Sequence, residues 1–131
     1  MNAAVKFLKD CGTFYLATLD GNYARVRPFG AVMEFEGKTY ICTNSEKDVY
    51  RQMIRNPNIE LSATAEDGRW IRITGQAVVD NRDEAKLAMF TEYPNLKEMY
   101  AGREKLYQVL YLKNVKAVIY SFTGEPETLS I

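Results

Sequence analysis

The strongest constraint on the fold of this chain is a set of glycine turns, each of which separates two runs of β-forming residues. Asp20-Gly21, Glu36-Gly37 and Asp67-Gly68 all fall between such runs. Glycine tolerates the positive φ that tight turns need, and Asp-Gly between two β-forming runs is a strong signal for a β-hairpin. Strands joined by so short a turn pair antiparallel. The sequence therefore predicts a sheet built from hairpins.

Several stretches are predicted as strands because they are rich in β-branched and aromatic residues. They are residues 13–19, 24–36, 39–43, 58–65, 70–79, 107–112 and 117–122. Pro28 and Gly30 predict a break or bulge in the second of them. Lys113-Asn114 is predicted to be the turn between the last two strands, and residues 123–131 are predicted to form a loop.

Helices are predicted from capping residues and from the spacing of apolar side chains. The predicted starts are Asn2, Ser45, Asn81 and Asn95, and the predicted stops of the first two helices are Gly12 and Asn56-Pro57. Ser45 and Asp48 have the spacing of a capping box. The predicted buried side chains of that second helix are Val49, Tyr50, Met53 and Ile54. The order of elements indicates a mainly β chain, an antiparallel barrel with peripheral helices, in one domain over residues 1–131.

Composition excludes several classes of function. The chain has 131 residues, of which 47% are hydrophobic, and 17 basic residues balance 17 acidic ones. Without net charge there is no general attraction for nucleic acid or for an anionic membrane, so neither partner is expected. No apolar run approaches the ~18 residues of a membrane helix. Cys11 and Cys42 match no metal-binding spacing, and with no apolar leader they predict reduced thiols in a cytoplasmic protein.

The chain contains no histidine. Serine–histidine and cysteine–histidine hydrolases, most catalytic zinc sites and histidine-ligated haem all need this residue. No metal site is predicted, and no catalytic acid or base can be nominated. Any chemistry is therefore expected to be carried by a bound cofactor.

Two arginines lie within the second predicted strand. Arg25 and Arg27 share a strand face with Phe29 and with further apolar residues, so that face is expected to pack inward. Buried guanidinium groups need an anionic partner, and no acidic residue alternates with them. A bound phosphate would provide that partner. The alternative is that both arginines reach solvent or pair with acidic residues elsewhere in the chain.

The hairpin that follows leads toward a second feature suited to anions. Its exit, Thr43-Asn44, runs into the predicted helix start at Ser45, where open backbone N–H groups favour negative charge. Lys47 would add a cation in the first turn. Each residue also has a plainer interpretation, Ser45 as an N-cap and Lys47 as a surface lysine. Trp70 could stack on a cofactor ring or belong to the core or an interface.

These segments together resemble the pyridoxamine 5'-phosphate oxidase-like family of FMN-binding split barrels, in its general-stress and nitroimidazole-reductase-related branch. The resembling segments are Phe14-Tyr15-Leu16-Ala17-Thr18, Arg25-Val26-Arg27-Pro28-Phe29, Ile41-Cys42-Thr43-Asn44, the helix ending at Asn56-Pro57, and Trp70-Ile71-Arg72-Ile73-Thr74-Gly75. The resemblance implies an antiparallel Greek-key split β-barrel. It also implies FMN as the cofactor.

The resemblance assigns expected roles to individual residues. Arg27 would contact FMN, and Pro28, Phe29 and Gly30 would run along the flavin ring. Arg25 is expected to neutralise the phosphate together with Arg27 and Lys47, or else to serve the dimer interface. The remaining assignments are Thr43 and Asn44 to the phosphate and ribityl chain, Lys47 to the phosphate, and Trp70 to the pyrimidine side of the flavin. Family members are typically homodimers with FMN in the cleft between subunits. Residues 120–124 are candidates for the contribution of the second subunit.

The expected activity is that of an oxidoreductase that reduces small molecules with electrons from NADH or NADPH. The alternative is a non-catalytic flavin-binding or sensor protein of the same fold, and a related deazaflavin remains open as the ligand. The chain ends at Ile131 without the C-terminal residues that bind substrate phosphate in true pyridoxamine-phosphate oxidases, so vitamin B6 synthesis is not expected. The absence of histidine also disfavours the haem-degrading relatives and those nitroimidazole reductases that rely on that residue.

Overall fold

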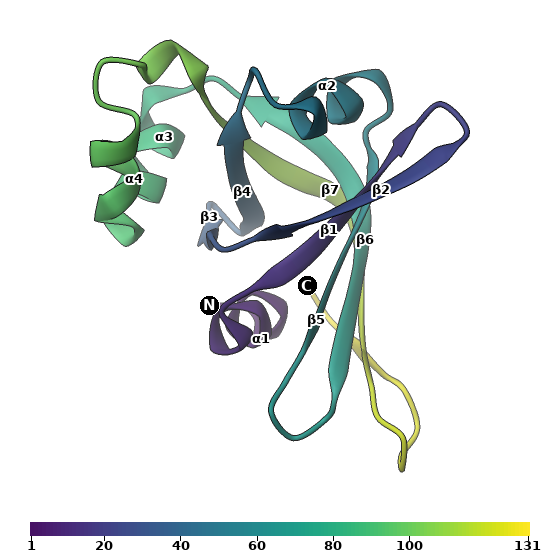
Figure 1. Ribbon diagram of the computed structural model, residues 1–131. Coiled ribbons are helices and arrows are strands. Elements are labelled where there is room, and N and C mark those ends of the chain that lie inside the picture. Colours follow the sequence, from purple (N-terminus) through teal and green to yellow (C-terminus); the bar gives the residue numbers. More distant parts are fainter.

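The computed structural model describes all of residues 1–131, as a single eight-stranded sheet with helices around it (Figure 1). The strands are β1 (Phe14–Asp20), β2 (Tyr23–Phe29), β3 (Val32–Phe35), β4 (Lys38–Asn44), β5 (Asn58–Thr64), β6 (Trp70–Asp80), β7 (Tyr107–Tyr120) and β8 (Glu127–Leu129). The helices are α1 (Ala3–Cys11), α2 (Asp48–Arg55), α3 (Asp83–Glu92) and α4 (Pro94–Met99), with a 3₁₀ turn over Glu104–Leu106.

The strands pair in the order β2-β1-β5-β6-β7-β4-β3, with β8 added beside β7. Every pair is antiparallel, as the hairpin turns predict. The two ends of this path, β2 and β3, do not pair with each other, so the barrel is not closed. The predicted fold class, a mainly β antiparallel split barrel with peripheral helices, is confirmed.

The predicted turn at Lys113-Asn114 is wrong, because β7 continues through it as one strand of 14 residues. Asn114 has a positive φ of 54°, a backbone conformation that is also common in turns. It forms a bulge instead, where the pairing with β6 shifts between Thr74 and Gln76. Gly75 lies opposite, and a Cβ there would approach the carbonyl oxygen of Lys113 to 3.2 Å. Close backbone packing therefore favours a glycine across from this bulge.

The expectation of a loop over residues 123–131 is also corrected. Residues Glu127–Leu129 form β8, which pairs with Ala117–Ile119 of β7. So short a strand has little local signal of its own. It forms because the long β7 offers free backbone groups along its edge.

The first helix follows its sequence signals closely, whereas the second does not. The Asn2 side chain accepts a hydrogen bond from Val5 N at 2.8 Å, and Gly12 ends α1 with a φ of 81°. The predicted start of α2 at Ser45 is wrong. Asn44 Oδ1 accepts from Glu46 N at 2.7 Å, which forms a turn after β4, and the helix begins only at Asp48.

The buried side of α2 also differs from the prediction. Val49 and Met53 are buried as expected, but Ile54 is 55% exposed and Gln52 is buried in its place. The predicted cap residues of the two later helices are likewise corrected. Arg82 and Tyr93 occupy the N-cap positions of α3 and α4, in place of Asn81 and Asn95.

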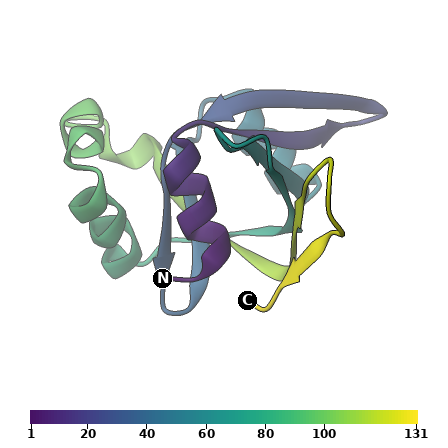
Figure 2. The same cartoon turned by 90° about the horizontal axis from the view of Figure 1, so that it is seen from below.

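The apolar side chains form two cores on the two sides of β4 and β7. The larger lies inside the barrel and includes α1, and the smaller joins β3, β4 and β7 to the helices α3 and α4. Figure 2 shows α1 across one end of the barrel and α3–α4 standing to one side. None of the helices combines the length and the apolar character needed to cross a membrane. In this arrangement α2, α4 and the end of β2 surround a common cavity.

Candidate functional site

A cavity of about 340 Å³ opens between the end of β2, the exit of β4, the start of α2 and the helix α4. It collects six of the nine residues predicted to hold a cofactor, namely Arg27, Pro28, Phe29, Gly30, Thr43 and Lys47. These residues come from two segments that the β3–β4 hairpin separates in sequence. The hairpin turns the chain back, so the end of β2 and the start of α2 lie at the same place.

Arg27 is the central cation of this cavity. Its Nη1 donates to Leu16 O at 3.2 Å and to Thr18 Oγ1 at 2.7 Å, and its Nη2 donates to Gln52 Oε1 at 2.7 Å. All three acceptors are neutral. A guanidinium carries five N–H donors. Three of those of Arg27 are used in these bonds, and the other two have no partner within the chain. Burial lowers the pKa of Arg27, but arginine remains charged at any physiological pH.

Arg25, two residues earlier on the same strand face, lies outside the cavity. Its Nε donates to Asp20 Oδ2 at 3.2 Å, and its guanidinium lies over the ring of Tyr23. The expectation that this whole face packs inward is corrected, because β2 is an edge strand and its first half extends beyond the core (Figure 1). Arg25 thus follows the alternative interpretation, pairing with an acidic residue near solvent.

Two other predicted residues also lie away from the cavity. Asn44 shapes the turn before α2 through its side-chain oxygen. Trp70 begins β6 beside the β5–β6 turn, at the end of the sheet far from α2 (Figure 1). Its ring stacks on Tyr120 with centroids 5.6 Å apart, and it also contacts Phe122. Within one chain, Trp70 and the Arg27 cavity therefore do not meet.

The start of α2 supplies the second anion-binding element. No side chain caps this helix end, and Lys47 occupies the N-cap position at the cavity wall. The first backbone N–H groups of a helix lack intrahelical acceptors and carry partial positive charge. Asp48 is the acidic residue of this turn, but its carboxylate pairs with Arg51 at 2.9 Å. The cavity therefore has a cationic side formed by Arg27, Lys47 and the helix end.

The opposite wall is largely apolar and comes from α4 and its flanks. Tyr93, Leu96, Met99 and Tyr100 line it, together with Asn95. Tyr93 fixes this wall to the sheet, since its hydroxyl donates to Val32 O at 2.9 Å and accepts from Val32 N at 3.2 Å. A ligand with one anionic end and one planar apolar end would match both walls.

The sequence did not indicate which residues hold Arg27 or which residues form the α4 wall. A buried Gln52 beside Val49 and Met53 on α2 was a usable signal, because a polar side chain on an apolar stripe needs a partner. Nothing in the spacing of residues 93–100 indicates that they face β2. Their placement depends on how α3 and α4 pack on β7.

Two side chains that line the cavity, Cys42 and Tyr100, stay protonated at neutral pH. Burial raises the pKa of the Cys42 thiol to about 12, so it remains protonated and unreactive. Burial likewise raises the pKa of Tyr100. The cavity can thus bind and orient an anion but offers no evident acid or base.

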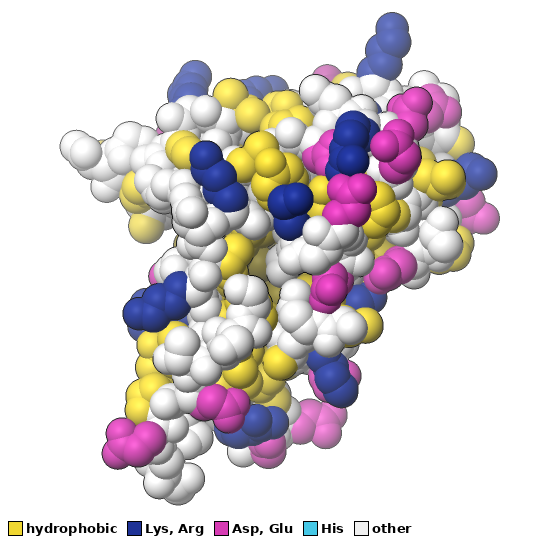
Figure 3. Space-filling view, turned by 180° about the vertical axis from the view of Figure 1, so that it is seen from behind, with side chains coloured by type: hydrophobic (Ala, Val, Ile, Leu, Met, Phe, Trp, Pro, Cys, Tyr) yellow, Lys and Arg dark blue, Asp and Glu magenta, His cyan; other side chains and the backbone are white.

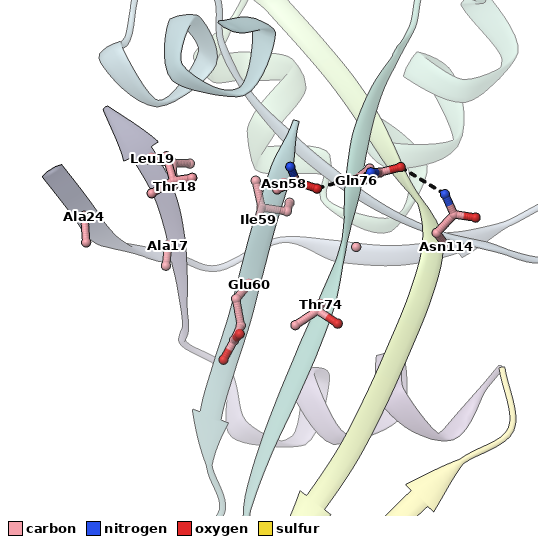
Figure 4. Close-up of a pocket in the computed structure, with 11 residues that line it drawn as sticks. Ala17, Thr18, Leu19, Ala24, Asn58, Ile59, Glu60, Thr74, Gln76 and Asn114 are labelled. Carbon is pink, nitrogen blue, oxygen red and sulfur yellow. Dashed lines mark hydrogen bonds between the residues drawn. The ribbon is translucent and has the colours of Figure 1, made fainter. Parts of the chain in front are cut away.

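A second hollow lies on the outer face of the sheet (Figure 4). This groove of about 420 Å³ crosses β1, β5, β6 and β7. Asn114 Nδ2 donates to Gln76 Oε1 at 2.9 Å, and Gln76 Nε2 donates to Asn58 Oδ1 at 3.2 Å. Glu60 is the charged residue of its lining, so the groove is not suited to an anion.

Comparison with known proteins agrees with this geometry. The sequence profile of the family described as pyridoxamine 5'-phosphate oxidase matches residues 1–120. The chain belongs to this family. Members of the pyridoxamine 5'-phosphate oxidase family generally bind a flavin, and the fold is of the flavin-binding oxidoreductase type. No curated protein matches the chain.

Solved structures resemble the chain over most of its length. A NimC/NimA family protein from Clostridium acetobutylicum is 48% identical, with a TM-score of 0.92, over 98% of this chain and 90% of that one. A protein related to general stress protein 26, also from C. acetobutylicum, is 14% identical, with a TM-score of 0.74, over 98% and 92%. A heme binding protein from Mycobacterium smegmatis is 14% identical, with a TM-score of 0.74, over 98% and 58%. The last two share the fold alone.

Proposed function

We propose that this protein binds FMN noncovalently in the Arg27 cavity and acts in the cytoplasm as an oxidoreductase on small molecules. The observation that carries the proposal is the state of Arg27, a half-buried guanidinium whose protein partners are all neutral. A half-buried cation without a contacting carboxylate favours an anionic ligand, and arginine pairs with phosphate through paired hydrogen bonds. Lys47 and the open end of α2 support the same anion.

The remaining walls fit the rest of such a ligand. Pro28, Phe29 and Gly30 continue from Arg27 along one side, and Leu96 and Met99 face them from α4. An apolar cleft with a few placed polar groups is typical of cofactor sites, and about 340 Å³ lies in their usual size range of about 300–1,000 Å³. When bound, FMN would supply the electron transfer, with NADH or NADPH as the proposed donor. The chain's own residues would hold the phosphate and exclude water from the ring.

We further propose that two copies of the chain form the working unit. The outward face of the β1–β2 hairpin is apolar, with Tyr15 51% exposed, Val26 67% exposed and Leu19 41% exposed, and Val26 lies opposite Ala17, between the levels of Tyr15 and Leu19. An apolar strand face of this kind favours contact with a second copy. Since Trp70 cannot reach the cavity of its own chain, any contact of Trp70 with a flavin would have to occur in the partner.

Sedimentation equilibrium tests the dimer directly. We expect a mass twice the 15.0 kDa of the chain, and a monomer for the variant Val26→Asp. A monomeric wild-type protein that still binds FMN would contradict the dimer and leave the FMN proposal intact.

Reconstitution with FMN tests the cofactor. The purified protein should show the visible absorption of oxidised flavin, or acquire it after incubation with FMN and gel filtration. A protein that stays colourless and quenches no flavin fluorescence would refute the proposal. A chromophore with a deazaflavin spectrum would correct the ligand and retain the site.

A non-catalytic flavin binder or sensor is the second candidate. It is favoured by one observation: burial raises the pKa of Cys42 and of Tyr100, so neither of these cavity side chains can act as a base at neutral pH. Steady-state oxidation of NADH or NADPH by the FMN-loaded protein separates the two candidates. Turnover with an added electron acceptor supports the oxidoreductase, and stable oxidised flavin in the presence of both nucleotides supports the sensor.

A nucleic-acid-binding barrel is not favoured by the surface. Figure 3 shows lysine and arginine side chains mixed with aspartate and glutamate over that face of the molecule. Binding to the phosphate backbone needs a stripe of one sign of charge. An oligonucleotide titration at low salt is expected to show no binding.

A further inference from the structure

The side chains behind Arg27 form a closed triangle of hydrogen bonds. Thr18 Oγ1 donates to Gln52 Oε1 at 2.5 Å, and Arg27 donates to both of these oxygens at 2.7 Å. Thr18 and Gln52 are both buried, 3% and 8% exposed. The guanidinium has no acceptor, so the oxygen of the Gln52 amide must be the atom that faces it. Gln52 therefore has one orientation, fixed by its two donors.

This triangle sets Arg27 apart from the arginines that form ion pairs with carboxylates, which are Arg25, Arg51, Arg69, Arg72 and Arg82. The other two, Arg55 and Arg103, are exposed to solvent, and Arg103 donates to Met99 O at 2.9 Å. Arg27 is held by three neutral oxygens. Asp48 also acts on Arg27 through space, but its carboxylate pairs with Arg51. Arg27 is thus fixed in position without a carboxylate in contact with it.

Gln52 differs from a glutamate only in carrying an amide nitrogen where glutamate has a second carboxylate oxygen. Glutamate at this position would form a buried ion pair with Arg27. Glutamate has nearly the same shape as glutamine, but its carboxylate would neutralise Arg27 from behind. Partly buried charges interact strongly because water screens them little. An amide oxygen supplies the same hydrogen bond without the opposing charge.

We propose that Gln52 is the positioning residue of the cavity, and that its neutrality makes the site select a phosphate-bearing flavin over the same flavin without phosphate. The proposal rests on the proposed FMN function and names a determinant of that specificity. Gln52 itself does not touch the ligand. It acts through Arg27, whose remaining N–H donors it directs toward the phosphate.

The test compares the dissociation constants of FMN and riboflavin for wild type and the variant Gln52→Glu, by quenching of flavin fluorescence. We expect the preference of the wild type for FMN to fall at least tenfold in Gln52→Glu, with the riboflavin constant changed less than threefold. Asn56→Asp is the matched control. It places the same added charge at the far end of α2 and keeps an oxygen acceptor for Asn58 N. Its preference should stay within threefold of the wild type.

Three results would overturn the proposal: an unchanged preference in Gln52→Glu, an equal loss of both flavins, or an equal drop in the control. If Gln52→Glu does not fold, Gln52→Met carries the test. It removes the acceptor but adds no charge, and the FMN preference should fall about threefold. A wild type that binds neither flavin would instead refute the proposed function.

Discussion

Arg27 and Arg82 are both held by several hydrogen bonds, yet the partners of Arg82 are carboxylates and those of Arg27 are neutral. Arg82 donates to Asp80 and to Glu36, and Tyr40 donates to the same Asp80 at 2.7 Å. Arg27 meets only oxygens without charge. The Arg82 cluster joins the end of β6 to the β3–β4 hairpin and the start of α3. An arginine whose charge is satisfied stabilises structure, whereas one that is fixed but unsatisfied is suited to a ligand.

The largest expected effect is a loss of FMN affinity when Arg27 is replaced. Arg27→Ala should weaken FMN binding by about a hundredfold, because charge-assisted hydrogen bonds contribute about 1.5–3 kcal/mol each. Fluorescence titration measures it, and Arg25→Ala is the control, expected to change the affinity less than threefold. Equal losses in both variants would show that the phosphate does not distinguish the two arginines.

The next-largest effect is expected on stability, at the carboxylate that binds Arg82. Asp80→Asn should lower the free energy of unfolding by about 2 kcal/mol, since it removes the charged acceptor of Arg82 and Tyr40. Urea denaturation measures this change. FMN affinity should remain within twofold of the wild type. An unchanged free energy of unfolding, or a loss of FMN affinity in its place, would contradict the separate roles of Arg82 and Arg27.

The same carboxylate predicts a dependence on pH. The guanidinium of Arg82, with help from the Tyr40 hydroxyl, holds the pKa of Asp80 well below its ordinary value of about 3.9. Its contribution to stability is therefore complete above about pH 4 and is lost as the pH falls toward the folded pKa. Urea denaturation at a series of acidic pH values should show a shallower acid decline for Asp80→Asn. Identical slopes would exclude Asp80 as a source of the decline.

The smallest effect is expected at Lys47. Its side chain is exposed, so Lys47→Ala should weaken FMN binding only about threefold at moderate salt, and less at high salt. Lys6→Ala, on α1, serves as the control for net charge and should leave the affinity unchanged. A loss as large as that of Arg27→Ala would make Lys47 the principal phosphate ligand.

The sequence predicted those parts of the fold that depend on neighbours along the chain. Asn2 and Gly12 bound α1 as expected, and the glycine turns join the predicted hairpins. It failed where distant segments decide the local structure. Asn114 looked like a turn residue, but its pairing with β6 keeps β7 continuous through a bulge. Likewise, Ser45 has the sequence signal of a helix cap, but its backbone N–H donates to Leu106 O at 2.8 Å, next to the β4–β7 pairing, and the helix begins only at Asp48.

The candidate site shows the same division. The sequence predicted that a short hairpin places the end of β2 close to Thr43 and Lys47. Gln52 and the α4 wall could not be predicted in this way, because they reach the cavity only through the packing of α2 and α4 on other elements.

By itself, the sequence determined an antiparallel sheet, and it placed two arginines two residues apart on one strand face. It could not determine which of them keeps its charge free for a ligand. Only the tertiary structure decided that, because hydrogen-bond partners are chosen by distance in space. The pairing of β2 with β1 brings Asp20 to Arg25, and the packing of α2 against β1 brings the neutral Gln52 to Arg27.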